Sequence, residues 1–435
     1  MLRKLHAQRR ELLGVSVSLL FLVVPNQSLF AQDTPFTLGQ CIDSVVSHSY
    51  LYRAGEYRTR AAGYEADISR TYMMPVVSGD AGIDGHFLSP YNFSQAWAMV
   101  HGDWSLGDFI RRSDRLARQE VVTAEMMKEQ TRLDAISRAV SLYMSILQQR
   151  KEIRLLDDRI ALLRDHLVVA RSLWNAGVRT RMDILQTESE INRMNVEKTR
   201  VAMTIRNLMQ ELAAITGLPA EDSLTLVHID APRLIDEMTV SGASDTLVRR
   251  NPLYQVYLSR IETQHLQSEL VSALRWPHLT AGGGRYRDGD PTGDGNYWLL
   301  SAGLTIPIYQ WGRIKQMKKK SEALAFSLNS ELADLSRELQ IHLAKTVNRM
   351  EELRKMLDMQ NQRLENAREA WTLASINYKA GLITNLDYLT TQQQVTSTEI
   401  AIAQTRLQYV MNLIEYYLTT NQVEKIRKMG TYVKE

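Results

Sequence analysis

Long stretches of this chain place an apolar residue at alternating steps of three and four. The first series is Leu156, Ile160, Leu163, Leu167, Ala170 and Trp174. The second, interrupted by one glutamine, is Leu353, Leu357, Gln360, Leu364, Ala367, Trp371 and Ala374, and the third is Ile400, Ala403, Leu407, Val410, Ile414 and Tyr417. This spacing is typical of helices that pack side by side as coiled coils.

These series lie in runs that contain neither glycine nor proline. The runs are residues 108–176, 178–216, 313–380 and 382–429. Because glycine and proline are the strongest breakers of regular structure, each run is predicted to be helical over nearly its whole length. A helix of about 68 residues would be roughly 100 Å long, far beyond the helices of ordinary globular domains.

Two other segments alternate apolar and polar residues with a period of two, which predicts β-strands. One follows Pro75 and gives a hairpin at about 75–106, and the other follows Pro277 and gives a hairpin at about 277–308. The returning strand of the second hairpin has an apolar face made of Trp298, Leu300, Ala302, Leu304 and Ile306. Such alternation, bordered by aromatics, is typical of outer-membrane strands, so we expect this face to contact lipid. A half-buried hairpin of a soluble domain would alternate in the same way.

A short phrase occurs twice in the chain, as AGVRTRMDILQT from Ala176 and as AGLITNLDYLTT from Ala380. Gly177 and Gly381 each stand at the end of a predicted long helix, at the position that favours a left-handed backbone. A second helical run follows each glycine within a few residues. Each phrase therefore predicts the tip of a long helical hairpin.

The residues that follow each glycine are suited to start the next helix. Thr180 and Thr384 are the predicted N-caps, because a threonine hydroxyl can accept a hydrogen bond from a free N–H group of the first turn. Asp183 and Asp387, three residues further on, are the predicted acidic partners of capping boxes, and their charges suit the helix dipole.

The N-terminus has the layout of a secretory signal peptide over residues 1–31. Four basic residues precede or flank an apolar run from Leu12 to Val24, which is short for a membrane span. Residues 1–32 hold four of the 52 basic residues and one of the 49 acidic ones, so the rest of the chain has 48 of each. Nothing in this balance indicates a nucleic-acid partner.

The chain offers little chemistry of the kind that enzymes or metal sites need. It contains no P-loop, no HExxH and no Gly-x-Ser-x-Gly motif, and its nine histidines are scattered. The single Cys41 excludes an internal disulfide and is expected to be a buried structural residue. Eighteen methionines could suit Cu(I), but those on the long helices have a plain packing role. We predict no catalytic residue, cofactor or metal.

The duplicated order of these segments resembles that of the TolC-like outer membrane efflux proteins. The resemblance covers almost the whole chain after the signal peptide. It rests on FTLGQCIDSVVSHSYL, on the hairpins after Pro75 and Pro277, on WGRIKQ before a long helix, and on the two AG-x-x-T-x-x-D-x-L tips. The implied fold is mainly α with a membrane β-barrel portion. Coiled-coil helical hairpins form an α-barrel, and four strands per chain complete a barrel of about twelve strands in a homotrimer.

The implied division of the chain follows the repeat. Residues 32–217 are expected to form the first structural repeat, and residues 251–418 the second. Residues 218–250 are the expected connecting, equatorial segment, and residues 419–435 the C-terminal tail.

The resemblance also implies a function and its sites. The protein would be a non-enzymatic exit duct in the outer membrane of a Gram-negative bacterium, extending into the periplasm. It would act with a periplasmic membrane-fusion adaptor and an inner-membrane transporter in a tripartite efflux pump. The adaptor would dock at the tips, on Gly177, Val178, Arg179, Gly381, Leu382 and Ile383. Asp387 would line the narrow entrance, where Thr390 stands in place of the second acid of some family members.

Two alternatives fit parts of the pattern. The same architecture could serve as the exit duct of a type I protein secretion system. From a different class, a soluble periplasmic coiled-coil scaffold would also have long helical hairpins, with the β-hairpins as small sheets.

Overall fold

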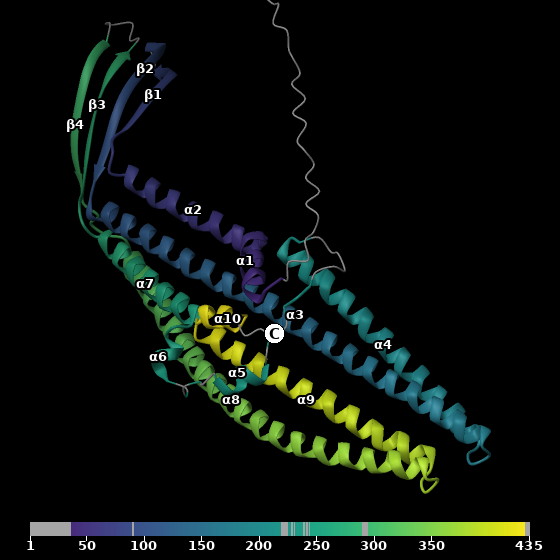
Figure 1. Ribbon diagram of the computed structural model, residues 1–435. Helices are drawn as coiled ribbons and strands as arrows, with labels where there is room; N and C mark the ends of the chain where they lie inside the picture. Colours follow the sequence, from purple (N-terminus) through teal and green to yellow (C-terminus); the bar gives the residue numbers. More distant parts are fainter. Residues whose placement is uncertain are drawn as a thin grey trace, which may run out of the picture. The chain divides into compact units, whose positions relative to one another are not determined.

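The protein is described by a computed structural model that covers residues 36–88, 91–218, 225–227, 229, 231–237, 240, 242, 244–288 and 295–430 (Figure 1). The predicted signal peptide, the turn at Ser89 and Pro90, and the Gly/Asp-rich turn at 289–294 lie outside the described residues. None of the helices among the described residues is both long and apolar enough to cross a membrane.

The helices fall into two matching sets (Figure 1). The first set is α1 (Leu38–His48), α2 (Tyr50–Thr71), α3 (Asp108–Asn175) and α4 (Arg181–Thr216). The second is α7 (Pro252–Ala273), α8 (Arg313–Lys379) and α9 (Asn385–Thr419), and the short helices are α5 (Ala231–Glu237), α6 (Asp245–Val248) and α10 (Val423–Met429). α2 and α7 have 22 residues each, α3 and α8 have 68 and 67, and α4 and α9 have 36 and 35, so the chain is an internal duplication.

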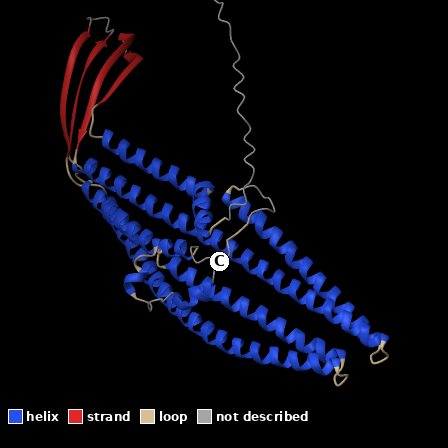
Figure 2. Ribbon diagram, in the orientation of Figure 1, coloured by secondary structure: helices blue, strands red, loops and turns tan. Residues whose placement is uncertain are grey.

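The long helices extend as far as the glycine-free runs allow. α3 begins directly after Gly107, and α8 begins directly after Gly312. Each packs against the helix that follows it, α3 on α4 and α8 on α9, so the predicted coiled-coil hairpins are confirmed (Figure 2). In the first apolar series Leu167 is half-buried and Trp174 is exposed, and the other members are buried, namely Leu156, Ile160, Leu163 and Ala170.

Within the described residues, four strands form one antiparallel sheet in the order β1-β2-β3-β4 (Figure 2). The strands are β1 (Val76–Leu88), β2 (Tyr91–Leu106), β3 (His278–Asp288) and β4 (Gly295–Thr305). β2 and β3 pair with each other and so join the two repeats. The predicted hairpins are confirmed, but the last strand ends at Thr305 rather than near residue 308. Pro307 explains the early end, because proline has no N–H to donate to a ladder, and Ile306 therefore lies outside the strand.

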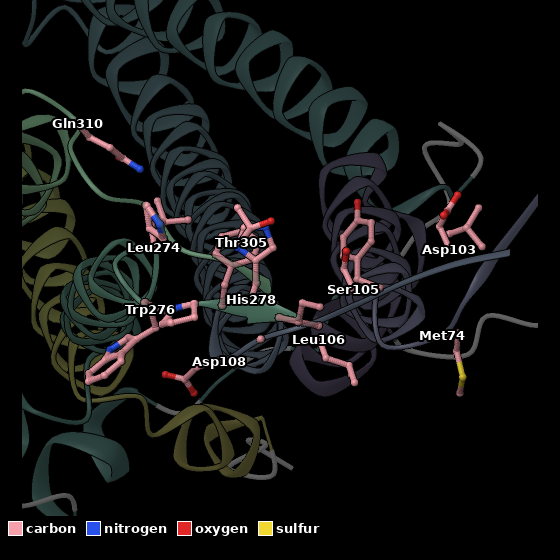
Figure 3. A pocket seen from close by; sticks show the side chains of 18 of the residues that line it. Met74, Asp103, Ser105, Leu106, Asp108, Leu274, Trp276, His278, Thr305 and Gln310 are labelled. Carbon is pink, nitrogen blue, oxygen red and sulfur yellow. The ribbon is translucent and has the colours of Figure 1, made fainter. Parts of the chain in front are cut away.

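A cavity of about 650 Å³ lies where the sheet meets the ends of α3 and α7 (Figure 3). The strands contribute both polar and apolar residues to its lining, namely Val76, Asp103, Ser105, Leu106, His278 and Thr305. Because successive side chains of a strand point to opposite faces, Leu304 and Leu300 point away from the cavity. Leu300 is 86% exposed, so the predicted apolar face of β4 is uncovered in the single chain.

The main hydrophobic core lies midway along α3, where α1, α9 and α10 pack near it. Tyr143 is fully buried there, and its hydroxyl donates to the carbonyls of Phe36, at 3.0 Å, and Val227, at 2.8 Å. Cys41 is also fully buried, as expected, and burial raises the pKa of its thiol to about 12. A thiol with so high a pKa is unreactive at neutral pH, so Cys41 is a packing residue.

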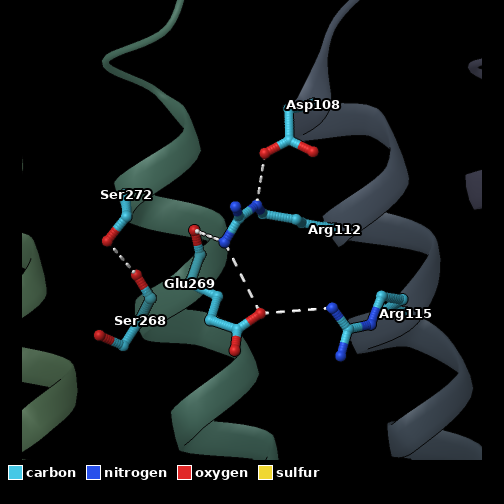
Figure 4. A network of polar contacts seen from close by, with 6 residues as sticks. All are labelled: Asp108, Arg112, Arg115, Ser268, Glu269 and Ser272. Atoms are coloured by element: carbon cyan, nitrogen blue, oxygen red, sulfur yellow. Dashed lines mark hydrogen bonds and ion pairs between the residues drawn. The ribbon is translucent and has the colours of Figure 1, made fainter.

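Ion pairs join α3 to α7 just below the sheet (Figure 4). Arg112 lies 2.7 Å from Asp108 of its own helix and 3.6 Å from Glu269 of α7. Arg115 also reaches Glu269, at 3.4 Å. Arg112 and Arg115 are thus neutralised within the protein.

Candidate functional site at the hairpin tips

The two hairpin tips have the same backbone structure. At the first tip, Gly177 N–H donates to the carbonyl of Trp174 at 2.9 Å, and Val178 N–H donates to that of Leu173 at 2.9 Å. At the second tip, the equivalent N–H groups of Gly381 and Leu382 donate to the carbonyls of Tyr378 and Asn377, at 3.0 and 2.9 Å. Both pairs of bonds make a Schellman motif, which satisfies the last carbonyls of a helix.

The glycines of both tips have a left-handed backbone, with φ of 71° at Gly177 and 83° at Gly381. A Cβ atom added to either glycine would meet nothing within 4 Å. Glycine is therefore required at these two positions by the backbone conformation alone, since a left-handed φ strains residues that have a Cβ.

The second tip has the predicted capping box. Asp387 N–H donates to the Thr384 hydroxyl at 3.2 Å, and Thr384 N–H donates to the Asp387 carboxylate at 3.0 Å. The Thr384 hydroxyl also donates to that carboxylate, at 2.6 Å. These bonds from Thr384 lower the pKa of the Asp387 carboxyl, which is therefore ionised at neutral pH.

The first tip does not have a capping box, contrary to the prediction for Thr180 and Asp183. Thr180 occupies the N-cap position, but its side chain accepts no hydrogen bond from the helix. Its hydroxyl donates weakly to Asp183 Oδ1 at 3.4 Å, while Asp183 Oδ2 accepts a hydrogen bond from the Tyr378 hydroxyl at 3.2 Å. The Asp183 side chain therefore joins the two hairpins instead of capping α4.

Arg179 also joins the hairpins, although it was predicted to be part of an exposed docking surface. One of its terminal nitrogens donates to the carbonyls of Tyr378, at 3.0 Å, and Ile383, at 2.6 Å. Its guanidinium carbon lies 4.6 Å from the centre of the Tyr378 ring, a cation–π distance. Arg179 is therefore partly buried and held by the second tip.

A buried polar group continues this contact between α3, α4 and α9. His166 Nε2 lies 2.7 Å from Asn385 Oδ1, and the His166 ring stacks on Tyr388 at 3.8 Å. The Asn385 amide nitrogen donates to the Asp183 carbonyl at 3.1 Å and to Gln186 Oε1 at 3.1 Å. Since the Asn385 oxygen must accept, His166 carries its proton on Nε2.

The charge state of His166 follows from its burial, since it is only 5% exposed. Desolvation lowers the His166 pKa, and the opposing effects of Asn385 and Asp183 are smaller. His166 is therefore neutral at pH 7. Within the described residues, no group of three or more His, Cys, Asp or Glu side chains is placed to hold a metal ion.

Apolar side chains are exposed around both tips. Val178 is 57% exposed and Leu382 is 75% exposed, and Met182 and Leu386 are exposed beside them. Ile383 differs from the expectation of an exposed residue, because it packs against the cluster that contains Tyr388 and is partly buried.

The sequence did not reveal His166, Tyr378 or Asn385 as site residues. One signal in the sequence was that His166 lies three residues after Leu163 of the first apolar series, so a polar side chain could be expected beside a buried helix contact. Another was the contrast between the two copies, in which Asn385 of the second phrase stands opposite Arg181 of the first.

The comparisons with known proteins bear on this architecture. A sequence profile described as outer membrane efflux protein matches residues 42–218 and, a second time, residues 244–421. The chain belongs to the outer membrane efflux protein family. The two matches correspond to the two sets of helices and strands, so the predicted duplication is confirmed.

Relatives and solved structures agree with this assignment. Nodulation protein T of Rhizobium leguminosarum bv. viciae is 23% identical over 84% of this chain and 78% of its own length. The pyoverdine export outer membrane protein OpmQ of Pseudomonas putida is 22% identical over 70% of this chain and 66% of its own length. The structure of CusC superposes with a TM-score of 0.79 over 89% of this chain and 92% of that one, at 12% identity, and so supports the fold.

The resemblance to TolC-like proteins drawn from the sequence is thereby confirmed. This outer membrane efflux protein is a channel component of efflux pumps in the outer membrane of Gram-negative bacteria. It is a transport protein and not an enzyme. The alternative of a soluble coiled-coil scaffold is wrong.

Proposed function

We propose that three copies of the chain close into one passive exit duct, which receives small organic compounds from an inner-membrane transporter through a periplasmic adaptor. The β-sheets of the three copies form the membrane barrel, and the helical hairpins form the periplasmic tunnel. The tips of the hairpins are the surface that meets the adaptor.

The observation that carries this proposal is the open sheet. β1 and β4 stand at the two ends of the strand order, and within the described residues each has one edge without a partner strand. Unpaired edges cannot face lipid, because their N–H and C=O groups would stay unsatisfied. Four strands are too few to close a membrane barrel, whose smallest forms have about eight, whereas three copies supply about twelve.

The helices below the sheet support the same closure. α2 packs mainly on α3, and α8 packs on α7 and α9, so in the part of the chain that the structure describes each has a side without a long partner helix. On α2, Tyr50, Tyr57 and Tyr64 are exposed at heptad spacing, which is the spacing of a coiled-coil seam. A neighbouring copy that pairs its β4 with β1 would bring its α8 to this seam.

The names of relatives support small organic cargo. The OpmQ relatives are named for pyoverdine export, and more distant ones for antibiotic and toluene efflux. Transport is passive in this proposal, because energy comes from the inner-membrane transporter.

The tips support docking through their exposed apolar side chains, since exposed apolar residues grouped together mark interaction surfaces. The adaptor surface includes Val178 and Leu382 with the two glycines between the helices. Arg179 and Ile383 belong to this surface through their position, and they also hold the two tips together. Asp387 is exposed and ionised, so three copies would make an acidic ring that favours cations.

The test is complementation of a strain that lacks the gene, scored by resistance to dyes and antibiotics. Leu382→Asp should abolish resistance while the yield of trimer in the outer membrane stays normal, because a charge would be buried against the adaptor. Met359→Asp is the matched control, since Met359 is 62% exposed on α8, twenty residues before the end of that helix at Lys379. Full resistance with Leu382→Asp would refute docking through this tip.

A second test addresses the membrane face of the sheet. Leu300→Arg should destabilise the inserted barrel by roughly 2–4 kcal/mol if it lies near the bilayer midplane. Ser301→Arg, on the opposite face of the same strand, should be tolerated much better. Equal amounts of both variants in the outer membrane would show that the face is assigned wrongly.

A further inference from the structure

The segment between β4 and α8 has large apolar side chains that are exposed to solvent in the single chain. Ile308 is 94% exposed, Tyr309 is 68% exposed and Trp311 is 84% exposed. The Tyr309 and Trp311 rings contact each other edge to face, with centroids 4.9 Å apart. His278 pairs with Thr305 across the sheet, so the exposed Trp276 lies close to the same level.

The backbone at Trp311 is unusual for a bulky residue. Its φ of 45° is left-handed, and Gly312 follows with a φ of 74°. A tryptophan in this conformation is strained, and such strain persists where the surroundings or a function require it. No core packing accounts for it, because the ring is almost wholly exposed.

Five basic residues follow without an intervening acid, namely Arg313, Lys315, Lys318, Lys319 and Lys320. Arg313 lines the cavity under the sheet, and Lys320, seven residues on, lies on the same side of α8 by helical periodicity. At about 100° per residue, Lys315 and Lys319 lie roughly 120–160° around the helix from Arg313. They therefore point away from the cavity, as the apolar face of β4 also does.

These outward lysines differ from Arg112 and Arg115 near the start of α3. Arg112 and Arg115 are neutralised by Asp108 and Glu269, as Figure 4 shows. Lys315 and Lys319 have no hydrogen bond or ion pair among the described residues. Lys318 pairs only loosely with Glu322, at 3.6 Å. The positive charges of Lys315 and Lys319 are thus not neutralised by the described residues, so they can bind an anionic group outside the chain.

We propose that Tyr309, Trp311, Lys315 and Lys319 form a collar that binds the anionic headgroups of phospholipids in the periplasmic leaflet of the outer membrane. The apolar face of β4, the exposed aromatic rings and the lysines follow one another along the chain. This is the order of hydrocarbon, interface and headgroup in a bilayer, where aromatic rings lie at the interface and lysines reach the lipid phosphates. Juxtamembrane lysines favour anionic lipids for the same electrostatic reason.

The proposal rests on the proposed membrane placement of the sheet, and it adds a lipid preference to it. The purified full-length protein is reconstituted in vesicles of phosphatidylcholine that contain one tenth phosphatidylglycerol. Either lipid is supplied with brominated chains, which quench nearby tryptophans. The Trp311 signal is the difference between the protein and its Trp311→Phe variant, and the Trp298 signal is obtained in the same way with Trp298→Phe.

If the collar binds anionic lipid, brominated phosphatidylglycerol should quench Trp311 fluorescence several times more strongly than expected for a lipid that makes up one tenth of the vesicle. Lys315→Gln with Lys319→Gln should remove this excess, a loss of at least about fivefold in the local enrichment. Arg313→Gln with Lys320→Gln removes the same charge from the cavity side and should leave the excess unchanged. High salt should weaken it in the unaltered protein, because the lysines are exposed.

The opposite outcomes are distinguishable. If phosphatidylcholine and phosphatidylglycerol quench Trp311 in proportion to their amounts while Trp298 is quenched, the sheet is in the membrane and the collar has no lipid preference. If Trp298 is quenched and Trp311 is not quenched by any lipid, a neighbouring copy covers the collar. If neither tryptophan is quenched, the membrane placement of the sheet itself is wrong. Each of these results would overturn the proposed collar.

Discussion

The two hairpin tips share one sequence phrase and one backbone, yet their side chains have different partners. At the second tip, Asp387 caps its own helix and faces solvent. At the first tip, the equivalent Asp183 leaves α4 uncapped and accepts a hydrogen bond from Tyr378 of the other hairpin. The duplicated residues thus keep the turn in both copies, while their side chains have taken up different roles.

The positions that differ between the copies are the ones that join the hairpins. Tyr378 corresponds to Trp174, and the first is buried while the second is exposed. Asn385 corresponds to Arg181, and again only the residue of the second copy is buried. Because the two hairpins meet on one side only, equivalent residues face different surroundings. Sequence symmetry therefore predicts the turn and not the contacts.

The largest effect should come from Asn385→Ala. It leaves His166 Nε2 and the Asp183 carbonyl without their partner in a buried place, which should cost about 2–3 kcal/mol. Arg181→Ala changes the equivalent exposed position of the first tip and should cost less than about 0.5 kcal/mol. Denaturant unfolding of the detergent-solubilised protein measures both. Equal costs would mean that the two tips are equivalent in energy as well as in sequence.

Arg179→Ala should come next, at about 1–2 kcal/mol, because it removes charged hydrogen bonds to two carbonyls and the contact with the Tyr378 ring. Amide hydrogen exchange at both tips should become faster, since the hairpins are then free to separate. Lys379→Ala is the control, because Lys379 is an exposed cation near the same tip without a shown partner among the described residues. Unchanged exchange with Arg179→Ala would show that this residue does not hold the tips together.

Gly177→Ala and Gly381→Ala should destabilise the protein equally, because the two tips have the same backbone conformation at these positions. Each should destabilise by about 1 kcal/mol through backbone strain, since the space around both glycines is open. Gly63→Ala, in the interior of α2, also meets open space but has no left-handed φ, so it should stabilise by about 0.5–1 kcal/mol. Thermal unfolding compares the three, and a cost at Gly63 as large as at the tips would contradict this explanation.

The smallest effect should be a pH dependence that comes from His166. Its pKa is lowered in the folded protein, so its contribution is constant above the unfolded value of about 6.5. As the pH falls below that value, the unfolded chain binds a proton that the folded chain resists, and stability is lost. The loss should be less than about 1 kcal/mol at pH 6. The difference between the protein and His166→Gln across pH 5.5–7.5 should show this slope, and parallel curves would contradict it.

The sequence predicted the parts of the fold that local rules determine. The long helices end where Gly177 and Gly381 permit a left-handed turn, and the strands begin directly after Pro75 and Pro277. The spacing of apolar residues and the positions of glycine and proline determine where helices and strands begin and end, because these boundaries depend on residues that are close together in the sequence. The early end of β4 could also have been predicted, because Pro307 lies within the segment that the alternating pattern assigned to the strand, up to about residue 308.

The contacts between the hairpins could not be predicted in the same way. Asn385 and His166 are 219 residues apart, and Tyr378 and Asp183 are 195 apart. The spacing of apolar residues along one helix does not show which face of one hairpin packs against the other hairpin. Arg179 looked like an exposed tip residue because it follows a turn, whereas a partner carbonyl at Ile383 holds it inward.

The most direct test of the account is the mass of the detergent-solubilised protein, measured by native mass spectrometry. The proposed duct needs three copies, because within the described residues the two outer strands of the sheet each lack a partner on one side. We expect a particle of three chains, each with the 49.7 kDa of the full sequence less the mass of any signal peptide that is removed. A stable particle of one chain, with the outer-membrane fraction fully extracted, would contradict it.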